Sequence, residues 1–457
     1  MESGKIIDFQ SLSEKVGRFN LKDKTCLIPE MNRIGCHLLA AVFRGFGIHA
    51  RVMETCKGME LGREYTSGKE CYPCQITTGD ILYAMNEERE RLGDAFNSED
   101  YIYFMPEADG PCRFGMYNKY QRIVLDSFPG LENLKIGALS TTDGYSLAGI
   151  IDDSRVRELR KTSYFSLVVG DILDRLLWRI RPYEKAPGAG DAFIEKAMHL
   201  LGDAFERFGP DKDFESILKQ LEAVIEEGKG IVDPEIPLKP LIGIVGEIYL
   251  RTHVQANQDV IRVLERYGAE VVNASIAEWA NYTSYDRLRE ARARFRLSLR
   301  QFRFGPLKTL LKDMVGYGGD FYYQRFRQKQ TYQHIRSLID LPEDHEIGHL
   351  EEILKEKDLF SFEVGTEACL SIPGIVAYAR DGYNGVVNVY PFTCMPSTIT
   401  SAIVRPIMNE LGVPYLDTPY DSSVQPGREA AIRTFMYQAE QHFRRHGRKG
   451  GKLVCRG

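Results

Sequence analysis

The sequence lacks any long apolar run. No stretch approaches the roughly 20 consecutive apolar residues that a helix needs to cross a bilayer, and residues 1–5 have neither the basic start nor the apolar core of a signal peptide. Charge of one sign is not in large excess either, because the formal net charge is -5 and the pI is about 6.1. We therefore predict a cytoplasmic protein without a membrane or nucleic-acid partner.

The sequence also lacks the glycine motifs of nucleotide-binding loops. The phosphate-binding loop that ends in Gly-Lys-Ser or Gly-Lys-Thr does not occur. Residues 243–247 resemble a glycine turn after a strand, but they do not have the GxGxxG spacing. The chain is therefore not expected to bind a nucleotide by itself.

What the sequence does contain is a globular composition and nine cysteines. Its 457 residues are 43% hydrophobic and 27% charged, which is enough for about two to four domains with buried cores. Thiols in the cytoplasm stay reduced. We therefore interpret clustered cysteines as metal ligands or catalytic groups rather than as disulfides.

Three segments show the pattern of a strand, a helix and a second strand. They are residues 25–56, 241–272 and 386–416, and in each a glycine closes the helix before the second strand. Such units form parallel sheets covered by helices. The predicted fold class is α/β, with two doubly wound, Rossmann-like parallel-sheet domains.

A segment with helical periodicity separates the first unit from the second, and three closely spaced prolines follow it. We therefore predict three main parts. They are an N-terminal α/β domain over 1–152, a helical connector over 153–237 and a C-terminal α/β domain over 238–442.

Two further segments are expected near the C-terminal domain. The charged, aromatic-rich residues from about 285 to 341 split the strand and helix pattern and predict a helical insertion, interrupted at Gly316 to Gly319. Residues 443–457 are rich in Lys and Arg. They predict a basic, frayed and solvated tail.

Four cysteines lie in turn-like sequences, three in the predicted N-terminal domain and one in the C-terminal domain. Cys71 and Cys74 form a CxxC motif before a helical pattern. Cys112 and Cys394 each follow an apolar strand, at the edge where open α/β sheets bind ligands. Neighbouring glycines and prolines make tight turns that direct backbone N–H groups toward sulfur. The four thiols are therefore candidate ligands of one metal cluster shared by both domains.

Other interpretations of these thiols stay open at this point. A CxxC motif also occurs in zinc sites and in thioredoxin-like dithiols, and a single buried cysteine is commonly a core residue. Cys36 lies in the loop after the first strand and can approach the same edge. All the remaining cysteines are expected to be packing or surface residues: Cys26, Cys36, Cys56, Cys369 and Cys455.

Several motifs occur in an order that resembles a known superfamily. They are Thr66-Ser-Gly-Lys-Glu-Cys-Tyr-Pro-Cys74, Gly110-Pro-Cys-Arg-Phe-Gly115, Gly243-Ile-Val-Gly-Glu-Ile-Tyr249, Ala256-Asn-Gln258 and Pro391-Phe-Thr-Cys-Met-Pro396. Together they resemble the 2-hydroxyacyl-CoA dehydratase and benzoyl-CoA reductase-like superfamily over about residues 25 to 440. The closest resemblance is to the dehydratase-like region associated with acyl-CoA dehydratase activases, and the chain also resembles double-cubane cluster proteins.

The resemblance implies an oxygen-sensitive iron–sulfur protein that accepts single electrons of low potential from a separate, ATP-hydrolysing activase. Its cofactor would be a 4Fe–4S cluster or a larger cluster such as a double cubane. By motif, the ligands would be Cys112, Cys394 and one or both of Cys71 and Cys74. A homodimer is implied by the resemblance alone.

Three functions are compatible with these expectations. The first is reduction of a small-molecule substrate, the second is radical dehydration of a 2-hydroxyacyl-CoA, and the third is a non-catalytic electron relay or scaffold. A CoA thioester predicts a basic mouth that binds phosphate, and the sequence does not assemble one. Reduction of a small molecule is therefore preferred.

A few polar residues are candidates for supporting roles. Glu247, at the end of a predicted strand, is a candidate proton donor or cluster partner, with a buried structural carboxylate as the alternative. Arg113 is next to Cys112 and is a candidate for offsetting cluster charge or binding an acid group, as is Lys69. His37 and His253 follow the first strands of their units and are candidates for proton transfer.

Overall fold

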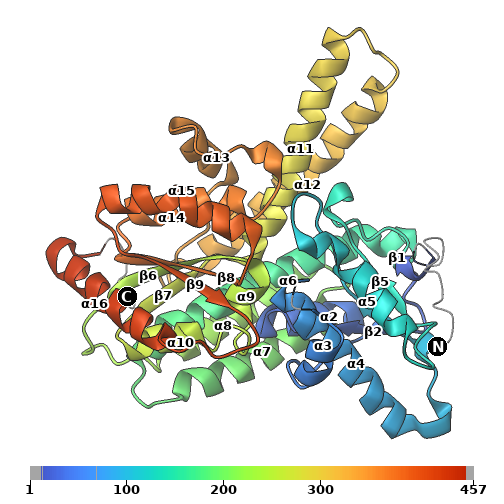
Figure 1. The fold of residues 1–457 in the computed structure, drawn as a ribbon, viewed down its shortest axis with the longest axis horizontal. Coiled ribbons are helices and arrows are strands. Elements are labelled where there is room, and N and C mark those ends of the chain that lie inside the picture. Colours follow the sequence, from blue (N-terminus) through green and yellow to red (C-terminus); the bar gives the residue numbers. More distant parts are fainter. Residues whose placement is uncertain (1–11, 13, 68, 449–457) are drawn as a thin grey trace.

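The computed structural model describes residues 12, 14–67 and 69–448. It contains two sheets, both built only of parallel strands, with helices on their faces (Figure 1). The predicted α/β class with two Rossmann-like parallel-sheet domains is confirmed. All three predicted units of strand, helix and strand are present.

The N-terminal sheet has five strands in the spatial order β1-β5-β4-β2-β3. In this sheet Cys26 pairs with Ala50 on one side and with Ile102 on the other. The chain passes from β2 to β3 on one side and then crosses to β4 on the other, so the strand order changes direction between β2 and β4. The strands are β1 (Val16–Gly17), β2 (Thr25–Ile28), β3 (His49–Val52), β4 (Tyr101–Phe104) and β5 (Lys135–Gly137).

Helices α2 to α5 and four short 3-10 turns complete the N-terminal domain. Helix α2 (Arg33–Gly45) begins where the Asn32 side chain accepts a hydrogen bond from the Gly35 N–H at 2.6 Å. The others are α3 (Met59–Glu64), α4 (Tyr72–Leu92), α5 (Tyr117–Asp126), η1 (Gly93–Ala95), η2 (Ser98–Asp100), η3 (Arg113–Met116) and η4 (Thr141–Asp143).

The C-terminal sheet has four strands in the spatial order β7-β6-β8-β9. The chain passes from β6 to β7 on one side and returns to β8 on the other, so here the strand order changes direction between β6 and β8. Val387 on β8 pairs with Ile244 on β6 and with Leu416 on β9. The strands are β6 (Leu241–Gly246), β7 (Glu270–Asn273), β8 (Gly385–Pro391) and β9 (Tyr415–Tyr420).

The helices of the C-terminal domain include a long hairpin, α11–α12, that projects from the body of the protein (Figure 1). Among the described residues, none of the helices is both long and apolar enough to cross a membrane. The helices are α9 (Ile248–Thr252), α10 (Val260–Arg266), α11 (Ile276–Arg300), α12 (Leu307–Ile335), α13 (Ile347–Glu356), η6 (Phe362–Val364), α14 (Ala368–Arg380), α15 (Met395–Leu411) and α16 (Arg428–His446).

The predicted helical connector consists of three long helices, α6 (Asp153–Ile180), α7 (Ala189–Phe208) and α8 (Phe214–Lys229), with η5 (Arg181–Tyr183) after the first. Helix α6 packs against α2 of the N-terminal domain and against β7 and α11 of the C-terminal domain. At one point α2 and α6 lie so close that a Cβ on Gly170 would be 3.2 Å from the Cα of Gly35. The connector is therefore a shared support for both sheets.

The buried apolar side chains lead to the same conclusion. Ile28 and Ile102 on one face of the N-terminal sheet belong to one continuous core with the connector helices, and so do Ile242 and Val387 of the C-terminal sheet. Because side chains alternate along a strand, the opposite faces pack into separate cores. The two domains thus meet through one common core.

The predicted interruption of the insertion at Gly316 to Gly319 is wrong. Helix α12 continues through these glycines, and the hairpin turns at 301–306 instead. A glycine inside a helix costs about 1 kcal/mol, whereas proline removes a backbone hydrogen bond and costs about 3 kcal/mol. The break accordingly falls at Gly305 and Pro306.

The predicted fraying of the basic tail is wrong over its first residues, although residues 444–447 are exposed as predicted. Helix α16 continues to His446, and beyond it the Arg448 side chain is only 3% exposed and pairs with Glu270. Arg179 pairs with the same carboxylate. Residues 449–457 of the predicted tail lie outside the described residues.

Candidate functional site

The predicted site residues lie at the carboxyl ends of both sheets. The loop after β4 carries Cys112, the loop after β8 carries Cys394, and Glu247 directly follows β6. In each domain these strands flank the point at which the strand order changes direction. Open parallel sheets bind ligands at this position, as the sequence predicts.

The CxxC motif lies at the start of α4, and its two thiols have different surroundings. Cys71 directly precedes the helix with a φ of 106°, a value that residues other than glycine rarely adopt. Pro73 lies in the first turn. The sulfur of Cys74 is fully buried, 3.9 Å from Oγ1 of Thr78.

Three of the four predicted ligands line one cavity of about 680 Å³, which we call the cysteine cavity. They are Cys71 and Cys112 from the N-terminal domain and Cys394 from the C-terminal domain, and Glu247 lies in the same wall. A water molecule takes up about 30 Å³ in the liquid, so a group of many atoms fits here. Cys74 is not part of the lining.

The backbone makes two close approaches around this cavity. Gly110 has a φ of 99°, and a Cβ there would lie 2.5 Å from the carbonyl oxygen of Gly365 in the other domain. Gly246 has a φ of 124°, and a Cβ there would lie 2.0 Å from the carbonyl oxygen of Val389. Only glycine fits both positions. These glycines bring the Cys112 loop against the C-terminal domain and place Glu247 beside β8.

Arg113 connects the loops that carry the cysteines. Its Nη2 donates to the carbonyl oxygen of Thr393 at 2.9 Å and to Oγ1 of the same residue at 3.2 Å. Its Nη1 donates to the carbonyl oxygen of Lys69. Because Arg113 follows Cys112 and Thr393 precedes Cys394, one guanidinium holds the candidate ligand loops together.

Burial controls the protonation of the three thiols. It raises the pKa of Cys71 to about 11 and raises the pKa of Cys112 and Cys394 still further. The carboxylate of Glu367 adds to the rise in the pKa of Cys112 and Cys394. Thiolates in this cavity therefore need a positive counter-charge, which bound metal ions provide.

Backbone N–H groups act on the same sulfur atoms in the opposite direction. The N–H of Phe114 lowers the pKa of Cys112 by hydrogen bonding, and the N–H of Ser397 does so for Cys394, although burial outweighs both. The N–H of Tyr72 acts similarly on the sulfur of Cys71. The turns thus present N–H groups to sulfur, as expected for thiolates that bind a cluster.

Glu247 caps a helix at the wall of the cavity. Its Oε1 accepts from the Tyr249 N–H at 3.1 Å and its Oε2 accepts from the Leu250 N–H at 2.9 Å. Burial, together with the nearby carboxylate of Glu367, raises the pKa of Glu247 to about 7. Glu247 therefore has the structural role of a helix cap. It also lines the cavity, which is the position expected of a proton donor or cluster partner.

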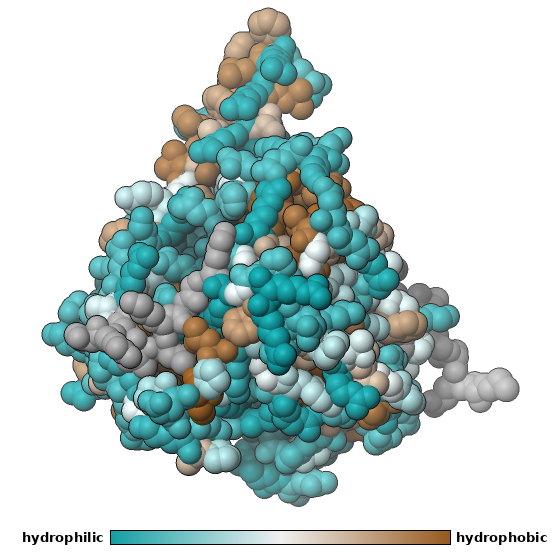
Figure 2. Space-filling view, turned by 90° about the vertical axis from the view of Figure 1, so that its left-hand side faces the viewer, coloured by the Kyte–Doolittle hydropathy of each residue, from teal (hydrophilic) through white to brown (hydrophobic). Residues whose placement is uncertain are grey.

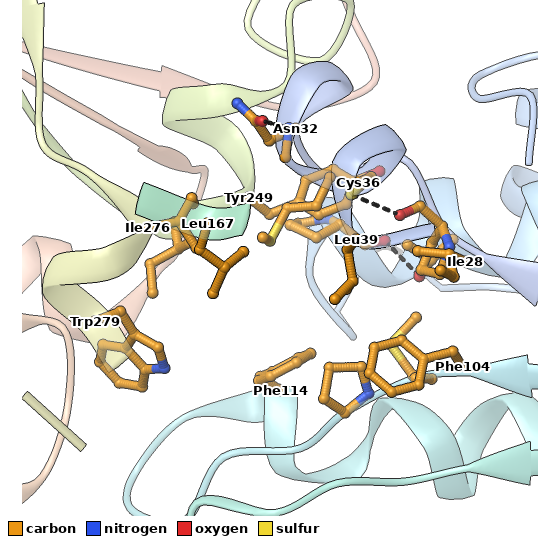
Figure 3. A pocket seen from close by; sticks show the side chains of 18 of the residues that line it. Ile28, Asn32, Cys36, Leu39, Phe104, Phe114, Leu167, Tyr249, Ile276 and Trp279 are labelled. Atoms are coloured by element: carbon orange, nitrogen blue, oxygen red, sulfur yellow. Dashed lines mark hydrogen bonds between the residues drawn. The ribbon is translucent and has the colours of Figure 1, made fainter. Parts of the chain in front are cut away.

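A second cavity, of about 240 Å³, adjoins the first, and we call it the apolar chamber. Figure 3 shows its side chains pointing inward from both domains and from α6. The indole N–H of Trp279 in its wall donates to the Tyr145 hydroxyl at 3.0 Å. None of the described residues that line it is Lys, Arg or His. Its labelled apolar residues are Ile28, Leu39, Phe104, Phe114, Leu167, Ile276 and Trp279.

The two cavities share a wall. Phe114, Tyr117 and Glu247 line both of them. The Tyr117 hydroxyl also interacts with the Cys71 thiol, and burial raises the pKa of this tyrosine well above its usual value. The Tyr117 hydroxyl, the Glu247 carboxyl group and the Phe114 ring therefore lie between the thiols and the apolar chamber.

The remaining candidates do not line the cysteine cavity. His37 is in α2 rather than in a loop and lines neither cavity, and His253 binds Oγ1 of Thr55 through Nε2 at 2.8 Å. Lys69 contributes only its carbonyl oxygen, to Arg113. Cys36 lies in α2 and lines the apolar chamber.

The other cysteines have packing positions where they are described. Cys26 and Cys369 are fully buried and Cys56 is partly buried. Cys455 lies outside the described residues. The expected packing role is thus seen for three of these cysteines.

Some site residues were not predicted from the sequence. Glu367 lies just before α14, and burial raises its pKa. Tyr117 begins α5, and Trp279 lies in the first turn of α11. None of them belongs to a motif with recognisable spacing, so only the fold brings them to the site.

In the described part of the chain, no three His, Cys, Asp or Glu side chains are close enough together to hold a single metal ion. No protein-family model matches the sequence. No curated protein matches it either.

Proposed function

We propose that this chain is a cytoplasmic iron–sulfur protein that receives low-potential electrons from an ATP-hydrolysing activase and reduces a small molecule. The observation that carries the proposal is the convergence of Cys71, Cys112 and Cys394, from distant parts of the sequence and from both domains, on one cavity. The cluster, a 4Fe–4S centre or a larger one such as a double cubane, would supply the single-electron chemistry.

The chemistry of the cavity supports a cluster of this type. Three thiols face it, each with a backbone N–H directed at its sulfur, and Glu247 adds a further acidic group to the same wall. Arg113 is the single Lys or Arg among the described residues that line the cavity. Such a surrounding favours a bound cationic centre, and Arg113 would partly offset the charge of the thiolates.

The apolar chamber supports the preference for a small substrate. A volume of about 240 Å³ and a mainly apolar lining suit a compact, uncharged molecule. The phosphates of CoA need cationic partners, and the described lining provides none. Acyl-CoA dehydration is therefore the second candidate, and it would require the CoA portion to bind outside this chamber.

The residues of the wall shared by the two cavities would also take part in the proposed reaction. Phe114 and Tyr117 separate a molecule in the chamber from solvent in the larger cavity, and Glu247 is placed to hold or pass a proton between the two. A carboxyl group with a pKa of about 7 is suited to both giving and taking a proton near neutral pH.

The test is anaerobic purification followed by iron and acid-labile sulfide analysis and EPR of the reduced protein. We expect iron and sulfide in the wild type and their loss in Cys71→Ala, Cys112→Ala and Cys394→Ala. Cys74→Ala should retain the cluster, because its sulfur does not line the cavity. Cys369→Ala, in a separate buried core, is the matched control.

Zinc without iron in the wild type would end the iron–sulfur proposal. Iron retained by both Cys112→Ala and Cys394→Ala would end the ligand assignment. To separate an enzyme from an electron relay, the activase-reduced protein is mixed with candidate small molecules. Reoxidation by a protein acceptor alone would favour the relay.

A further inference from the structure

A third cavity, of about 190 Å³, lies where the helical connector meets both domains, and we call it the connector cavity. Its wall comes from the start of α2, the end of α6, α7 and residues 252–262. Hydrophilic side chains cover most of the body on the face shown in Figure 2, whereas much of this cavity is apolar. Its buried apolar residues are Ile34, Leu177, Trp178, Ile194, Met198 and Ile261.

Charged side chains form the rim of the connector cavity. Arg33 pairs with Glu195 at 2.7 Å, which links α2 to α7. Arg262 pairs with Asp191 at 2.9 Å, which links α10 to α7. The Arg33 and Arg262 side chains are 52% and 45% exposed. The cavity therefore opens to solvent between these ion pairs.

The arginines of the lining already have carboxylate partners. Besides the two at the rim, Arg181 pairs with Glu265 at 2.7 Å and with Asp191 at 2.9 Å. The described lining contains neither Lys nor His. An anionic ligand would therefore have to compete with these carboxylates for each guanidinium.

The Asp174 carboxyl group, in contrast, has no cationic partner among the described residues. Its Oδ2 accepts a hydrogen bond from Nδ2 of Asn32 at 2.8 Å, and it forms no ion pair. Leu177 and Trp178, three and four residues further along α6, lie on the same face of the helix and line the same cavity. A carboxyl group in such apolar surroundings is stabilised in its charged form by a cation.

From these observations we propose that the connector cavity binds a small protonated amine, whose ammonium group donates hydrogen bonds to Asp174. The hydrocarbon part of the ligand packs on Leu177 and Trp178, and an aromatic ring also attracts a cation. The lining as a whole favours a positive ligand, because it contains three Arg and four carboxyl groups. These carboxyl groups belong to Asp174, Asp191, Glu195 and Asp259.

Asn32 connects this site to the apolar chamber. It lines both cavities, caps α2 through Oδ1 and binds Asp174 through Nδ2. An amine on Asp174 would therefore lie next to a residue of the chamber wall. The proposal does not depend on the cluster or on the reaction, because none of the residues of the connector cavity lines the cysteine cavity.

The experiment is titration of the full-length protein with n-pentylammonium chloride at constant ionic strength, followed by calorimetry and tryptophan fluorescence. Trp178 lines the connector cavity and Trp279, the second of the two tryptophans, lines the apolar chamber. In Trp279→Phe the fluorescence therefore comes from Trp178 alone. We expect a saturable change with a dissociation constant of roughly 1 mM or below.

Two ligands of the same chain length test whether the positive charge is required. 1-Pentanol is neutral and pentanoate is negative, and both should bind at least roughly tenfold more weakly than n-pentylammonium. Equal binding of 1-pentanol, or no saturable binding of n-pentylammonium, would overturn the proposal. Tighter binding of pentanoate would overturn it as well and would assign the cavity to an anion.

A variant tests the role of Asp174. Asp174→Asn should weaken n-pentylammonium binding at least roughly tenfold and leave 1-pentanol binding unchanged. The amide oxygen of the new side chain can still accept from Asn32, so the packing is kept, and circular dichroism checks the fold. Asp203→Asn, at an exposed position on α7 outside the cavity, is the matched control. Equal amine binding by Asp174→Asn and the wild type would overturn the assignment of Asp174.

The pH dependence tests the same carboxyl group without a mutation. Burial raises the pKa of Asp174 to about 7, so its ionised fraction rises about tenfold between pH 6 and pH 8. The alkylammonium stays protonated over this range. Its affinity should therefore rise by about the same factor, and a flat profile would contradict the role of Asp174.

Other charged groups surround Asp174 and enter the same profile. Arg175 and Arg181 lower its pKa from α6 and η5, although burial outweighs both. His199→Gln, which removes the imidazole beside Glu195, should show the same rise as the wild type. The charged groups that line the cavity from the other elements are Arg33, Asp191, Glu195, Asp259 and Arg262.

Discussion

Arg113 donates a hydrogen bond from Nη2 to the carbonyl oxygen of Thr393 at 2.9 Å, across the boundary between the two domains. Thr393 has a φ of 65°, which is strained for a β-branched residue. Surrounding contacts must hold such a conformation in place. The Arg113 side chain therefore fixes the backbone that leads into Cys394 as well as the loop that carries Cys112.

Replacing Arg113 should loosen the proposed cluster without unfolding the protein. Arg113→Met removes the hydrogen bonds to the Lys69 and Thr393 carbonyl oxygens and one positive charge beside the thiolates. We expect iron loss to a chelator to become severalfold faster, measured by the fading of the visible absorbance under anaerobic conditions. Arg380→Met, which removes an exposed pair with Glu356, is the control. Equal rates in all three proteins would contradict a positioning role for Arg113.

Filling the apolar chamber should impair the proposed substrate reduction and spare the proposed cluster. Ala280 lines the chamber from α11, and Ala280→Leu adds three carbon atoms to a cavity of about 240 Å³. The expected result is a higher KM for the small-molecule substrate with unchanged iron content and EPR spectrum. Ala293→Leu, at an exposed position on the same helix, is matched in size. Unchanged kinetics in Ala280→Leu would show that the apolar chamber does not bind the substrate.

His253 should make the protein sensitive to acid. Its Nδ1 accepts from the Ala256 N–H at 3.1 Å, so Nε2 carries the proton and donates to Oγ1 of Thr55 at 2.8 Å. Burial lowers the pKa of His253 to about 4, from an ordinary value of 6.5. The unfolded chain therefore takes up a proton first as the pH falls from 6.5 toward 4. The free energy of unfolding should drop by about 3 kcal/mol over this window from this residue.

The measurement is urea unfolding between pH 7 and pH 4 for the wild type and His253→Gln. The amide of Gln keeps a donor for Thr55 and does not titrate, so the variant should lose less stability on acidification. Burial also raises the pKa of Asp80 to about 7, with the opposite sign, and this contribution is common to both proteins. The exposed His199→Gln should behave as the wild type, and parallel curves for all three would contradict the assignment.

Arg448 should stabilise the fold although it lies near the end of the chain. Its Nη1 donates to Oε2 of Glu270 at 2.6 Å and its Nη2 donates to Oε1 at 3.1 Å, at a carboxylate that Arg179 also binds. Arg448→Met leaves a buried carboxylate with fewer charge partners, and we expect a loss of roughly 2 kcal/mol in unfolding free energy. Arg445→Ala, at an exposed position on α16, should change stability little. Equal stability of both variants would show that Arg179 alone is enough to neutralise the buried Glu270 carboxylate.

The parts of the fold that the sequence predicted are those encoded locally. A strand, a helix and a closing glycine such as Gly268 or Gly412 lie within about 30 residues. Their hydrophobic periodicity can therefore be seen directly in the sequence. The position of Cys112 and Cys394 after strands was predictable for the same reason. The break in the hairpin was misplaced because four residues with three glycines suggest a turn, while packing between α11 and α12 keeps the helix intact.

The composition of the site was less predictable because it depends on how distant segments pack. Cys71 and Cys74 are equivalent in a CxxC motif, and both belong to the same buried core, but only Cys71 also lines the cavity. Glu367 reaches the site through the contact between Gly110 and Gly365. No local pattern encodes such contacts between domains.

The distance in sequence between the cavity-lining cysteines has a consequence for biogenesis. A ribosome releases residues 71 and 112 long before residue 394 is made, so the proposed ligand set is incomplete for most of translation. Delivery of the proposed cluster would therefore follow synthesis of nearly the whole chain and the docking of the two sheets on α6. The donor of the cluster would meet a folded protein, and the opening of the cysteine cavity would be its route of entry.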